Sequence, residues 1–206
     1  MIKTIFFDFG GVIVKLPNLW WIRRLKNKLA LEEHPEILEM IENPYDAQLV
    51  TDICLGNISE DYLWEFLSEK LKVNPIMLKK IRLKFFSKRQ LNRQVVKYLA
   101  RLSLNYDTAI LSNAGDKSRQ LMEETYGLNR YVKEIIISAE EGVIKPDHRI
   151  FEIALNRMKA EPGTSLLLDD YYENVLSARK FGIHAVHFLN TKQALNDVRF
   201  ALNGRK

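Results

Sequence analysis

Cysteine is almost absent from the sequence, and this excludes one common way of stabilising a fold. Cys54 is the only cysteine among the 206 residues, so no disulfide can form within the chain. A single cysteine is typical of proteins from a reducing compartment, and we therefore expect a cytoplasmic protein.

Long apolar runs are missing as well. No stretch approaches the roughly 20 apolar residues that a membrane-spanning helix needs, so we expect no membrane partner. Met1 to Thr4 lead directly into a run typical of a strand, and we expect no signal peptide. Internal repeats and low-complexity linkers are not seen either. The length then predicts one domain with an insertion or two small domains.

Acidic residues are fewer than basic ones, and the formal net charge is +5. Basic side chains gather at Arg23, Arg24, Lys26 and Lys28, and again between residues 79 and 89. They are spaced along predicted helices, so we interpret them as solvated faces. Attraction of an anionic substrate is the alternative, and nucleic-acid binding is the least favoured. We expect a small anionic partner and no nucleic acid.

Five short apolar segments, separated by helical patterns, predict the core of the fold. The expected strands cover residues 3–8, 108–111, 134–137, 165–168 and 184–189. Strands that alternate with helices favour a parallel sheet covered on both faces. The sequence therefore predicts an α/β fold with a Rossmann-like parallel sheet of five strands. Asp116 and Asp147 are each expected to cap the start of a helix.

The stretch between the first strand and the others has a different character. It shows helical patterns and no convincing strand: Asp46 to Leu55 before the breaker Gly56, a helix capped by Ser59, and another that begins at Asn74-Pro75. We therefore predict an all-helical insertion of residues 16–86 in a core formed by residues 1–15 and 87–206.

Polar side chains stand where three of the predicted strands end. Asp8, followed closely by two glycines, ends the first strand, Ser112 the second and Asp169-Asp170 the fourth. Because the carboxyl ends of parallel strands share one edge of the sheet, these groups can converge, and Lys145 can join them from a loop. Carboxylates suit Mg²⁺ and can attack phosphorus, while lysine and hydroxyl groups can hold phosphate oxygens.

Taken singly, each of these residues has an ordinary structural explanation. Asp8 and the Asp169-Asp170 pair can be turn residues, Ser112 a helix cap and Lys145 a surface lysine. Their occurrence together, in this order, favours a site for phosphoryl transfer with Mg²⁺ as the cofactor.

Four motifs carry a resemblance to a known family. They are Phe7-Asp8-Phe9-Gly10-Gly11-Val12, Leu111-Ser112-Asn113, Gly142-Val143-Ile144-Lys145-Pro146-Asp147, and Leu168-Asp169-Asp170 with Asn174. The insertion adds Gly56-Asn57-Ile58-Ser59 followed by Trp64. The chain resembles a haloacid dehalogenase (HAD) superfamily hydrolase of the phosphatase branch, subfamily IA-like, whose helical cap follows the first strand. The resemblance implies that residues 16–86 form this cap.

The resemblance also implies a role for each matched residue. Asp8 would be the catalytic nucleophile that forms an aspartyl phosphate, and Lys145 would orient Asp8 and bind phosphate. Further phosphate contacts would come from Phe9, Gly10, Ser112 and Asn113, and the Mg²⁺ ligands from Asp8, the Gly10 carbonyl, Asp170 and Asp169, the last as a ligand or as the partner of one. The implied reaction is hydrolysis of a small phosphorylated metabolite, such as a sugar phosphate, by a monomer or homodimer.

One position departs from the family pattern. Family phosphatases usually have an aspartate two residues after the nucleophile as general acid and base, and this chain has Gly10 there. Such an acid contributes about 10²–10⁴-fold in rate. The substrate can have a good leaving group, as in an anomeric sugar phosphate or an acyl phosphate, or another group can replace the acid. The chain can also be a weakly active or non-catalytic phosphate-binding relative.

Two other reactions known in the family are less favoured. A dehalogenase, in which Asp8 attacks carbon, has tyrosine at the position of Gly10 and needs no metal, which leaves Asp169-Asp170 unexplained. A mutase must return phosphate to a sugar hydroxyl and needs the missing acid and base.

The cap is expected to set substrate choice, because it would close over Asp8. Trp20, Trp21, Arg23 and Arg24 lie just beyond the first loop, in a helix that Asn18 can cap. They are candidates for lining the cleft, and packing of both tryptophans inside the cap is the alternative.

Overall fold

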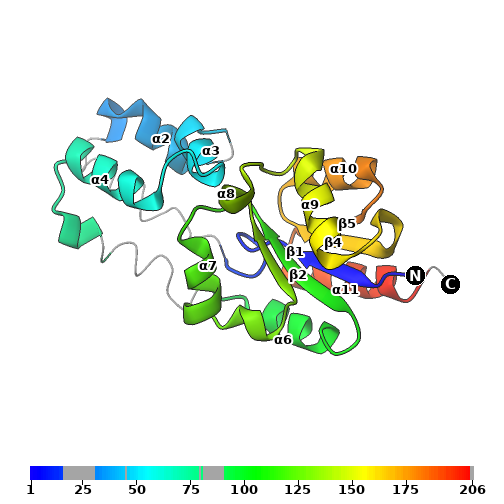
Figure 1. Ribbon diagram of the computed structural model, residues 1–206. Helices are drawn as coiled ribbons and strands as arrows, with labels where there is room; N and C mark the ends of the chain where they lie inside the picture. Colours follow the sequence, from blue (N-terminus) through cyan, green and yellow to red (C-terminus); the bar gives the residue numbers. More distant parts are fainter. Residues whose placement is uncertain (16–30, 45, 79, 81–90, 205–206) are drawn as a thin grey trace.

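The centre of the protein is a parallel β-sheet. The structure, a computed structural model, describes residues 1–15, 31–44, 46–78, 80 and 91–204. Five strands lie in the order β3-β2-β1-β4-β5 (Figure 1). They are β1 (Thr4–Phe7), β2 (Asp107–Ser112), β3 (Glu134–Ile137), β4 (Ser165–Asp169) and β5 (His184–His187). The predicted α/β fold with a five-stranded parallel sheet is confirmed.

The register of the strands brings their carboxyl ends level. Phe7 of β1 lies opposite Ile110 of β2 on one side and opposite Leu168 of β4 on the other. On the outer strand, His187 of β5 lies opposite Asp169. Residues that follow these strands therefore emerge at a single edge of the sheet, where open α/β sheets bind their ligands.

Helices cover both faces of the sheet. They are α6 (Arg93–Leu102), α7 (Ser118–Gln120) continued by the π-helical turn η3 (Leu121–Thr125), α8 (Ser138–Glu141), α9 (His148–Met158), α10 (Tyr172–Phe181) and α11 (Thr191–Leu202), with the 3-10 turns η4 (Leu128–Arg130) and η5 (Pro162–Thr164). Successive side chains of a strand point to opposite faces, so Ile5 and Phe7 pack with α6 and α11, while Phe6 packs with α9 and α10. Burial of each such side chain stabilises the fold by about 1.5–3 kcal/mol.

The two predicted aspartate caps have different outcomes. Asp147 caps α9 as expected and accepts a hydrogen bond from the Arg149 amide at 2.9 Å. The prediction for Asp116 is wrong, because α7 has no side-chain cap. The Asp116 carboxylate instead accepts a hydrogen bond at 2.9 Å from the amide of Glu60, which is distant in sequence. The Asp116 carboxylate therefore binds a distant backbone amide instead of capping α7, the role that the local sequence pattern predicts.

The described part of the predicted cap is helical. It contains η1 (Leu31–Glu33), α2 (Pro35–Glu42), α3 (Gln48–Cys54) and α4 (Glu60–Lys70), and residues 31–78 include no strand in the part that the structure describes. As predicted, Ser59 caps α4 by accepting from the Tyr62 amide at 3.1 Å. Gly56 follows the end of α3 with a left-handed φ of +76°. A small core of its own holds the cap together: Leu31, Ile37, Leu67 and Leu78.

The chain leaves the core and returns to it at neighbouring points. Val14 forms an antiparallel bridge with Leu91, and the Asn92 amide donates to the Ile13 carbonyl at 2.8 Å. The boundaries at 15/16 and 86/87 stay a prediction, because the segments just inside them lie outside the described residues. The same holds for the predicted helix after Asn18, with its tryptophans and arginines, and for most of the second basic cluster.

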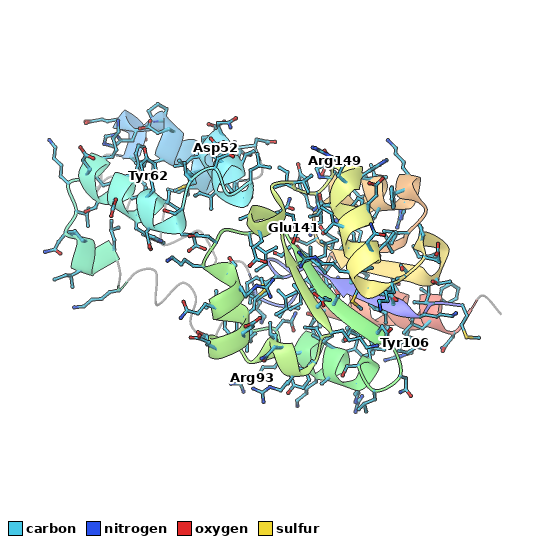
Figure 2. All side chains as sticks on the ribbon, in the orientation of Figure 1. Asp52, Tyr62, Arg93, Tyr106, Glu141 and Arg149 are labelled. Atoms are coloured by element: carbon cyan, nitrogen blue, oxygen red, sulfur yellow. The ribbon has the colours of Figure 1, made fainter. Side chains whose placement is uncertain are left out.

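The cap lies at the edge of the sheet where the strands end. Figure 1 shows α3 beside α8, the short helix that follows β3. Figure 2 places Asp52 and Tyr62 on the cap and Glu141 of α8 at the junction with the core. Within the described ranges, no helix is both long enough and apolar enough to cross a membrane.

Candidate active site

The polar residues predicted at strand ends lie at one edge of the sheet. Asp8 directly follows β1, and its amide donates to the Leu168 carbonyl of β4 at 2.9 Å. Ser112 and Asp169 are the last residues of β2 and β4. All three are buried, with exposed fractions of 7% for Asp8, 2% for Ser112 and 0% for Asp169. Buried polar groups are destabilising unless they are paired, so their partners define the site.

Lys145 is the hydrogen-bonding centre of the site. Its ammonium donates to Asp8 Oδ1 at 2.9 Å, to Asp169 Oδ2 at 2.6 Å and to the Leu111 carbonyl at 2.8 Å. The side chain is only 1% exposed. Burial alone would lower the pKa of Lys145, but attraction from Asp169 and Asp8 outweighs it and raises the pKa above its usual value. Lys145 therefore stays a cation between two acids and is not a surface lysine.

Asn113 holds the loop that carries Lys145. Its side-chain amide donates to the Lys145 carbonyl, and its side-chain oxygen accepts from the Lys145 amide, both at 2.8 Å. Gly142, with a φ of +66°, ends α8 in a backbone conformation that favours glycine. Both polar ends of the Asn113 side chain are thus engaged with Lys145, so a phosphate contact from Asn113 would have to come from its backbone.

Asp169 is engaged on both carboxylate oxygens. Besides Lys145 at Oδ2, the Tyr171 amide donates to Oδ1 at 2.9 Å and Asn174 Nδ2 donates to the same oxygen at 3.0 Å. Asn174 is 3% exposed. The sequence pattern included Asn174 in the fourth motif but gave it no role, since its partner is known only from the structure. Asn174 orients the carboxylate that in turn orients Lys145.

Three carboxylates gather beside the lysine. Oxygens of Asp8, Asp169 and Asp170 all lie within 4.8 Å of one another. Burial raises the pKa of Asp8 well above its usual value, Lys145 opposes this rise, and repulsion from the neighbouring acids adds to it. Burial, and then repulsion from Asp169, also raise the pKa of Asp170. With all three acids ionised, the group including Lys145 carries a net charge of minus two. An oxygen-only donor set with this excess charge fits a hard divalent cation such as Mg²⁺.

The first loop contributes through its backbone. Gly11 has a φ of +76°, and a Cβ atom at this position would stand 1.9 Å from Asp170 Oδ2. Glycine is therefore needed for the loop to approach Asp170, a requirement that the spacing of the motif does not reveal. Phe9 is 6% exposed and packs on Tyr126, with ring centroids 5.9 Å apart. Its side chain belongs to the core, and only its backbone can face a phosphate.

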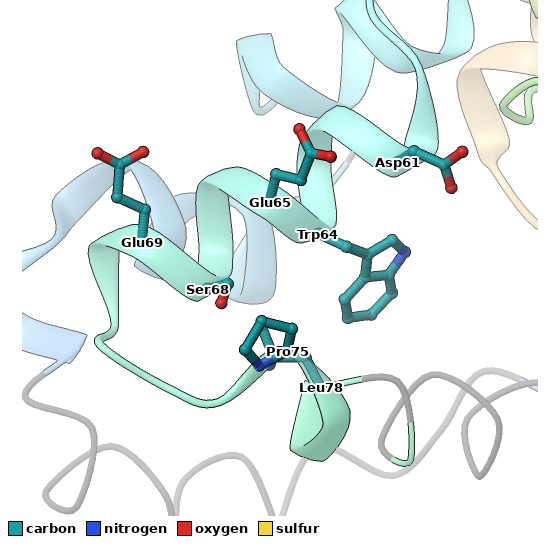
Figure 3. A pocket seen from close by; sticks show the side chains of 7 residues that line it. All are labelled: Asp61, Trp64, Glu65, Ser68, Glu69, Pro75 and Leu78. Atoms are coloured by element: carbon teal, nitrogen blue, oxygen red, sulfur yellow. The ribbon is translucent and has the colours of Figure 1, made fainter.

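A hollow in the cap is separate from this cluster. Figure 3 shows it between α4 and the helical turn that begins at Pro75. The residues that line it are Asp61, Trp64, Glu65, Ser68, Glu69, Pro75 and Leu78. No predicted catalytic, phosphate-binding or metal residue lines it, and its three carboxylates would repel a phosphate. We therefore place the candidate active site at Asp8 and Lys145 and not at this hollow.

Comparison with known proteins identifies the family of the chain. A family model described as haloacid dehalogenase-like hydrolase matches residues 5–188. The bifunctional epoxide hydrolase 2 of Mus musculus is 30% identical over 115 residues, which are 53% of this chain and 21% of the mouse protein. This chain thus matches about a fifth of the length of that relative.

One relative and one solved structure, both from Bacteroides thetaiotaomicron, match over most of their length. A D-ribitol-5-phosphate phosphatase is 26% identical over 190 residues, covering 88% of this chain and 89% of the relative. A HAD family enzyme, solved in complex with magnesium and inorganic phosphate, superimposes with a TM-score of 0.71 at 20% identity. The superposition covers 91% of this chain and 94% of that one, and at this identity it shows a shared fold.

Proposed function

The chain belongs to the haloacid dehalogenase-like hydrolase family, and we propose that it is a Mg²⁺-dependent phosphatase acting on a small phosphorylated metabolite. The observation that carries the proposal is the position of Lys145, whose ammonium bridges Asp8 and Asp169 while Asp170 stands beside them. This arrangement fixes the Asp8 carboxylate, the proposed nucleophile, and keeps the Lys145 ammonium next to it.

The proposed reaction has two steps at Asp8. In the first, a carboxylate oxygen of Asp8 bonds to phosphorus while the bond from phosphorus to the leaving oxygen breaks. In the second, water attacks the phosphorus of the aspartyl phosphate, which releases inorganic phosphate, returns the carboxylate and passes a proton to solvent. Lys145 orients Asp8 and stabilises negative charge on the phosphoryl oxygens, and Ser112 lies at the same sheet edge to hold them.

We infer the role of each carboxylate around Mg²⁺ from whether its oxygens are already hydrogen-bonded within the protein. Asp8, Asp170 and the Gly10 carbonyl would hold Mg²⁺, which offsets the charge of the phosphoryl group when bound. Asp169 has both oxygens engaged by Lys145, Tyr171 and Asn174. We therefore assign Asp169 to the orientation of Lys145 and not to direct coordination.

The relatives support this class of substrate. The ribitol-phosphate phosphatase acts, by its name, on a small phosphorylated polyol, and it matches nearly the whole of this chain. The related HAD family enzyme binds magnesium and inorganic phosphate together. We infer that a small phosphorylated metabolite is the substrate class here, and the absence of an acid at Gly10 favours one with a good leaving group, such as an anomeric sugar phosphate.

Gly10 favours a second candidate, a phosphate-binding relative with little or no turnover. No carboxylic acid follows Asp8 by two residues, so the leaving oxygen must take its proton from elsewhere. Within the phosphatase proposal this restricts the substrate to good leaving groups. A dehalogenase fits the site poorly, because the buried Asp169 and Lys145 and the partly buried Asp170 form a charged cluster suited to a phosphate and a cation.

The test is phosphate release from p-nitrophenyl phosphate and acetyl phosphate in the presence of Mg²⁺. We expect the native protein to cleave both and Asp8→Asn to lose at least about 10³-fold in kcat, as nucleophile removal does in other enzymes. Asp107→Asn, which alters a carboxylate paired with Lys133 at the surface, is the matched control and should keep full activity. Equal loss in both variants, or none in Asp8→Asn, would refute the assignment of Asp8.

A further inference from the structure

One short segment of the core connects the proposed phosphate site to the cap. This connecting segment, residues 112–118, begins at Ser112 and continues with Asn113, which holds the backbone of Lys145 through two hydrogen bonds of 2.8 Å. Its first two residues therefore belong to the site. A shift of the segment would displace Lys145, because Asn113 is hydrogen-bonded to both the backbone amide and the backbone carbonyl of Lys145.

The middle of the connecting segment is fixed to the core. The Ala114 amide donates to Ser138 Oγ at 3.0 Å, and the Ala139 amide donates to the Ala114 carbonyl at 3.3 Å. Ser138 is fully buried at the start of α8. Since both backbone groups of Ala114 are engaged, partly buried hydrogen bonds hold the middle of the segment against the start of α8.

The end of the connecting segment meets the start of cap helix α4. Asp116 Oδ1 accepts from the Glu60 amide at 2.9 Å, and Ser118 Oγ lies 3.5 Å from Glu60 Oε1. A Cβ atom on Gly115 would stand 2.7 Å from Ile53 Cγ2 of α3, so the segment touches the cap closely at this point. Lys117 adds an ion pair with Asp61 at 3.1 Å.

Two side chains share the capping of α4, and they come from different parts of the protein. Ser59, within the cap, binds the Tyr62 amide, whereas Asp116, from the core, binds the Glu60 amide. A negative charge at a helix N-terminus is favourable, which strengthens the Asp116 contact. The Lys117–Asp61 pair contributes little, because its side chains are 39% and 61% exposed and such pairs are weak.

We propose that Asp116 is a positioning residue that docks the cap on the connecting segment, so that cap docking and phosphate binding at Ser112 and Lys145 favour each other. The proposal rests on the proposed function, which supplies the phosphate. Because linkage is reciprocal, a phosphate that orders residues 112–114 strengthens the Asp116 contact, and loss of that contact weakens phosphate binding. Asp116 itself is not a member of the carboxylate cluster, and its carboxylate accepts from the Glu60 amide of the cap.

The experiment compares three variants of the full chain with the native protein. Asp116→Ala removes the acceptor from the core side of α4, and Asp116→Asn keeps an acceptor oxygen while removing the charge. Ser59→Ala removes the other capping acceptor of the same helix from within the cap and serves as the matched control. Two quantities are measured: the affinity for inorganic phosphate with Mg²⁺, by calorimetry, and the hydrogen exchange of the Glu60 and Tyr62 amides, by NMR.

We expect Asp116→Ala to speed exchange at Glu60 and to weaken phosphate affinity by about 5-fold or more, the size of a lost helix cap and of a small coupling. Asp116→Asn should recover most of the affinity. Ser59→Ala should speed exchange at Tyr62 and keep phosphate affinity within about 2-fold. In the native protein, phosphate should slow exchange at Glu60.

Affinity that is equal in native protein and Asp116→Ala, with faster exchange at Glu60, would overturn the coupling while leaving the proposed function intact. Equal losses in Asp116→Ala and Ser59→Ala would overturn it too, since general loosening of α4 would explain both. A native protein that binds no phosphate would overturn the coupling together with the proposed function. If Asp116→Ala does not fold, Gly56→Ala tests the same docking, because its Cβ would stand 2.5 Å from the Ala139 carbonyl of the core.

Discussion

Replacing Lys145 by methionine should destabilise the protein more than any surface charge removal. The Lys145 side chain is 1% exposed, and the side chains of its two acidic partners, Asp8 and Asp169, are 10% and 0% exposed. Removing one partner of a buried ion pair leaves the other charge uncompensated, which typically destabilises by about 3–5 kcal/mol. A domain of this length loses roughly 2–4 °C in Tm per kcal/mol, so we expect a Tm about 6–20 °C lower.

The assay is urea unfolding and thermal unfolding of Lys145→Met without Mg²⁺, followed by circular dichroism. Lys133→Met is the matched control, because Lys133 pairs with Asp107 at the surface with 64% and 43% exposure. Its effect should stay within about 1 kcal/mol. The double variant Lys145→Met/Asp169→Asn should regain part of the loss, since it removes one of the stranded charges. Equal losses for Lys145→Met and Lys133→Met would refute the account of Lys145 as the buried centre of the site.

Three further predictions concern the first loop of the site and the cysteine of the cap. Gly11→Ala should abolish the Mg²⁺-dependent rise in Tm, because its Cβ would stand 1.9 Å from Asp170 Oδ2. The control Gly163→Ala, whose Cβ would have no atom within 4 Å, should keep the rise. A Gly11→Ala protein with the native rise would contradict the required close approach of the loop to Asp170. Gly10 should make kcat/KM fall steeply as the pKa of the leaving group rises, with p-nitrophenyl phosphate cleaved and glycerol phosphate nearly inert, and Gly10→Asp should restore the poor leaving groups by at most about 10²–10⁴-fold; a flat dependence would show that another acid acts. Burial raises the pKa of Cys54 to about 12, so the native thiol stays protonated at pH 8.5. It should therefore react with iodoacetamide far more slowly in the native protein than in urea. Equal rates would show that the thiol is not buried.

The strands and the edge at which they end follow from sequence pattern. The run Glu134–Ile137 has three isoleucines, which are favoured in a buried strand, and β3 has the bounds expected from that run. The order of Asp8, Ser112 and Asp169 at strand ends follows because parallel strands share an edge, and the structure brings all three there.

The supporting contacts of the site could not be predicted in the same way. Asn113 has its partner, the Lys145 peptide group, 32 positions away, and Asn174 bonds Asp169 only because α10 packs back on β4. Asp116 shows the converse case, since its local signal predicts a helix cap and its carboxylate binds Glu60 of the cap instead. Local patterns locate the charged groups, while packing between distant segments decides which of them are bonded to each other.

The central claim is that Asp8 carries the phosphoryl group during turnover. It is tested by mixing the protein with Mg²⁺ and acetyl phosphate, quenching within the first turnover, reducing with borohydride and mapping the peptides by mass spectrometry. An acyl phosphate on Asp8 would be reduced to homoserine at position 8, and we predict this product in the native protein and its absence in Asp8→Asn. Release of phosphate by the native protein with an unmodified Asp8, or with reduction at another carboxylate, would contradict the account.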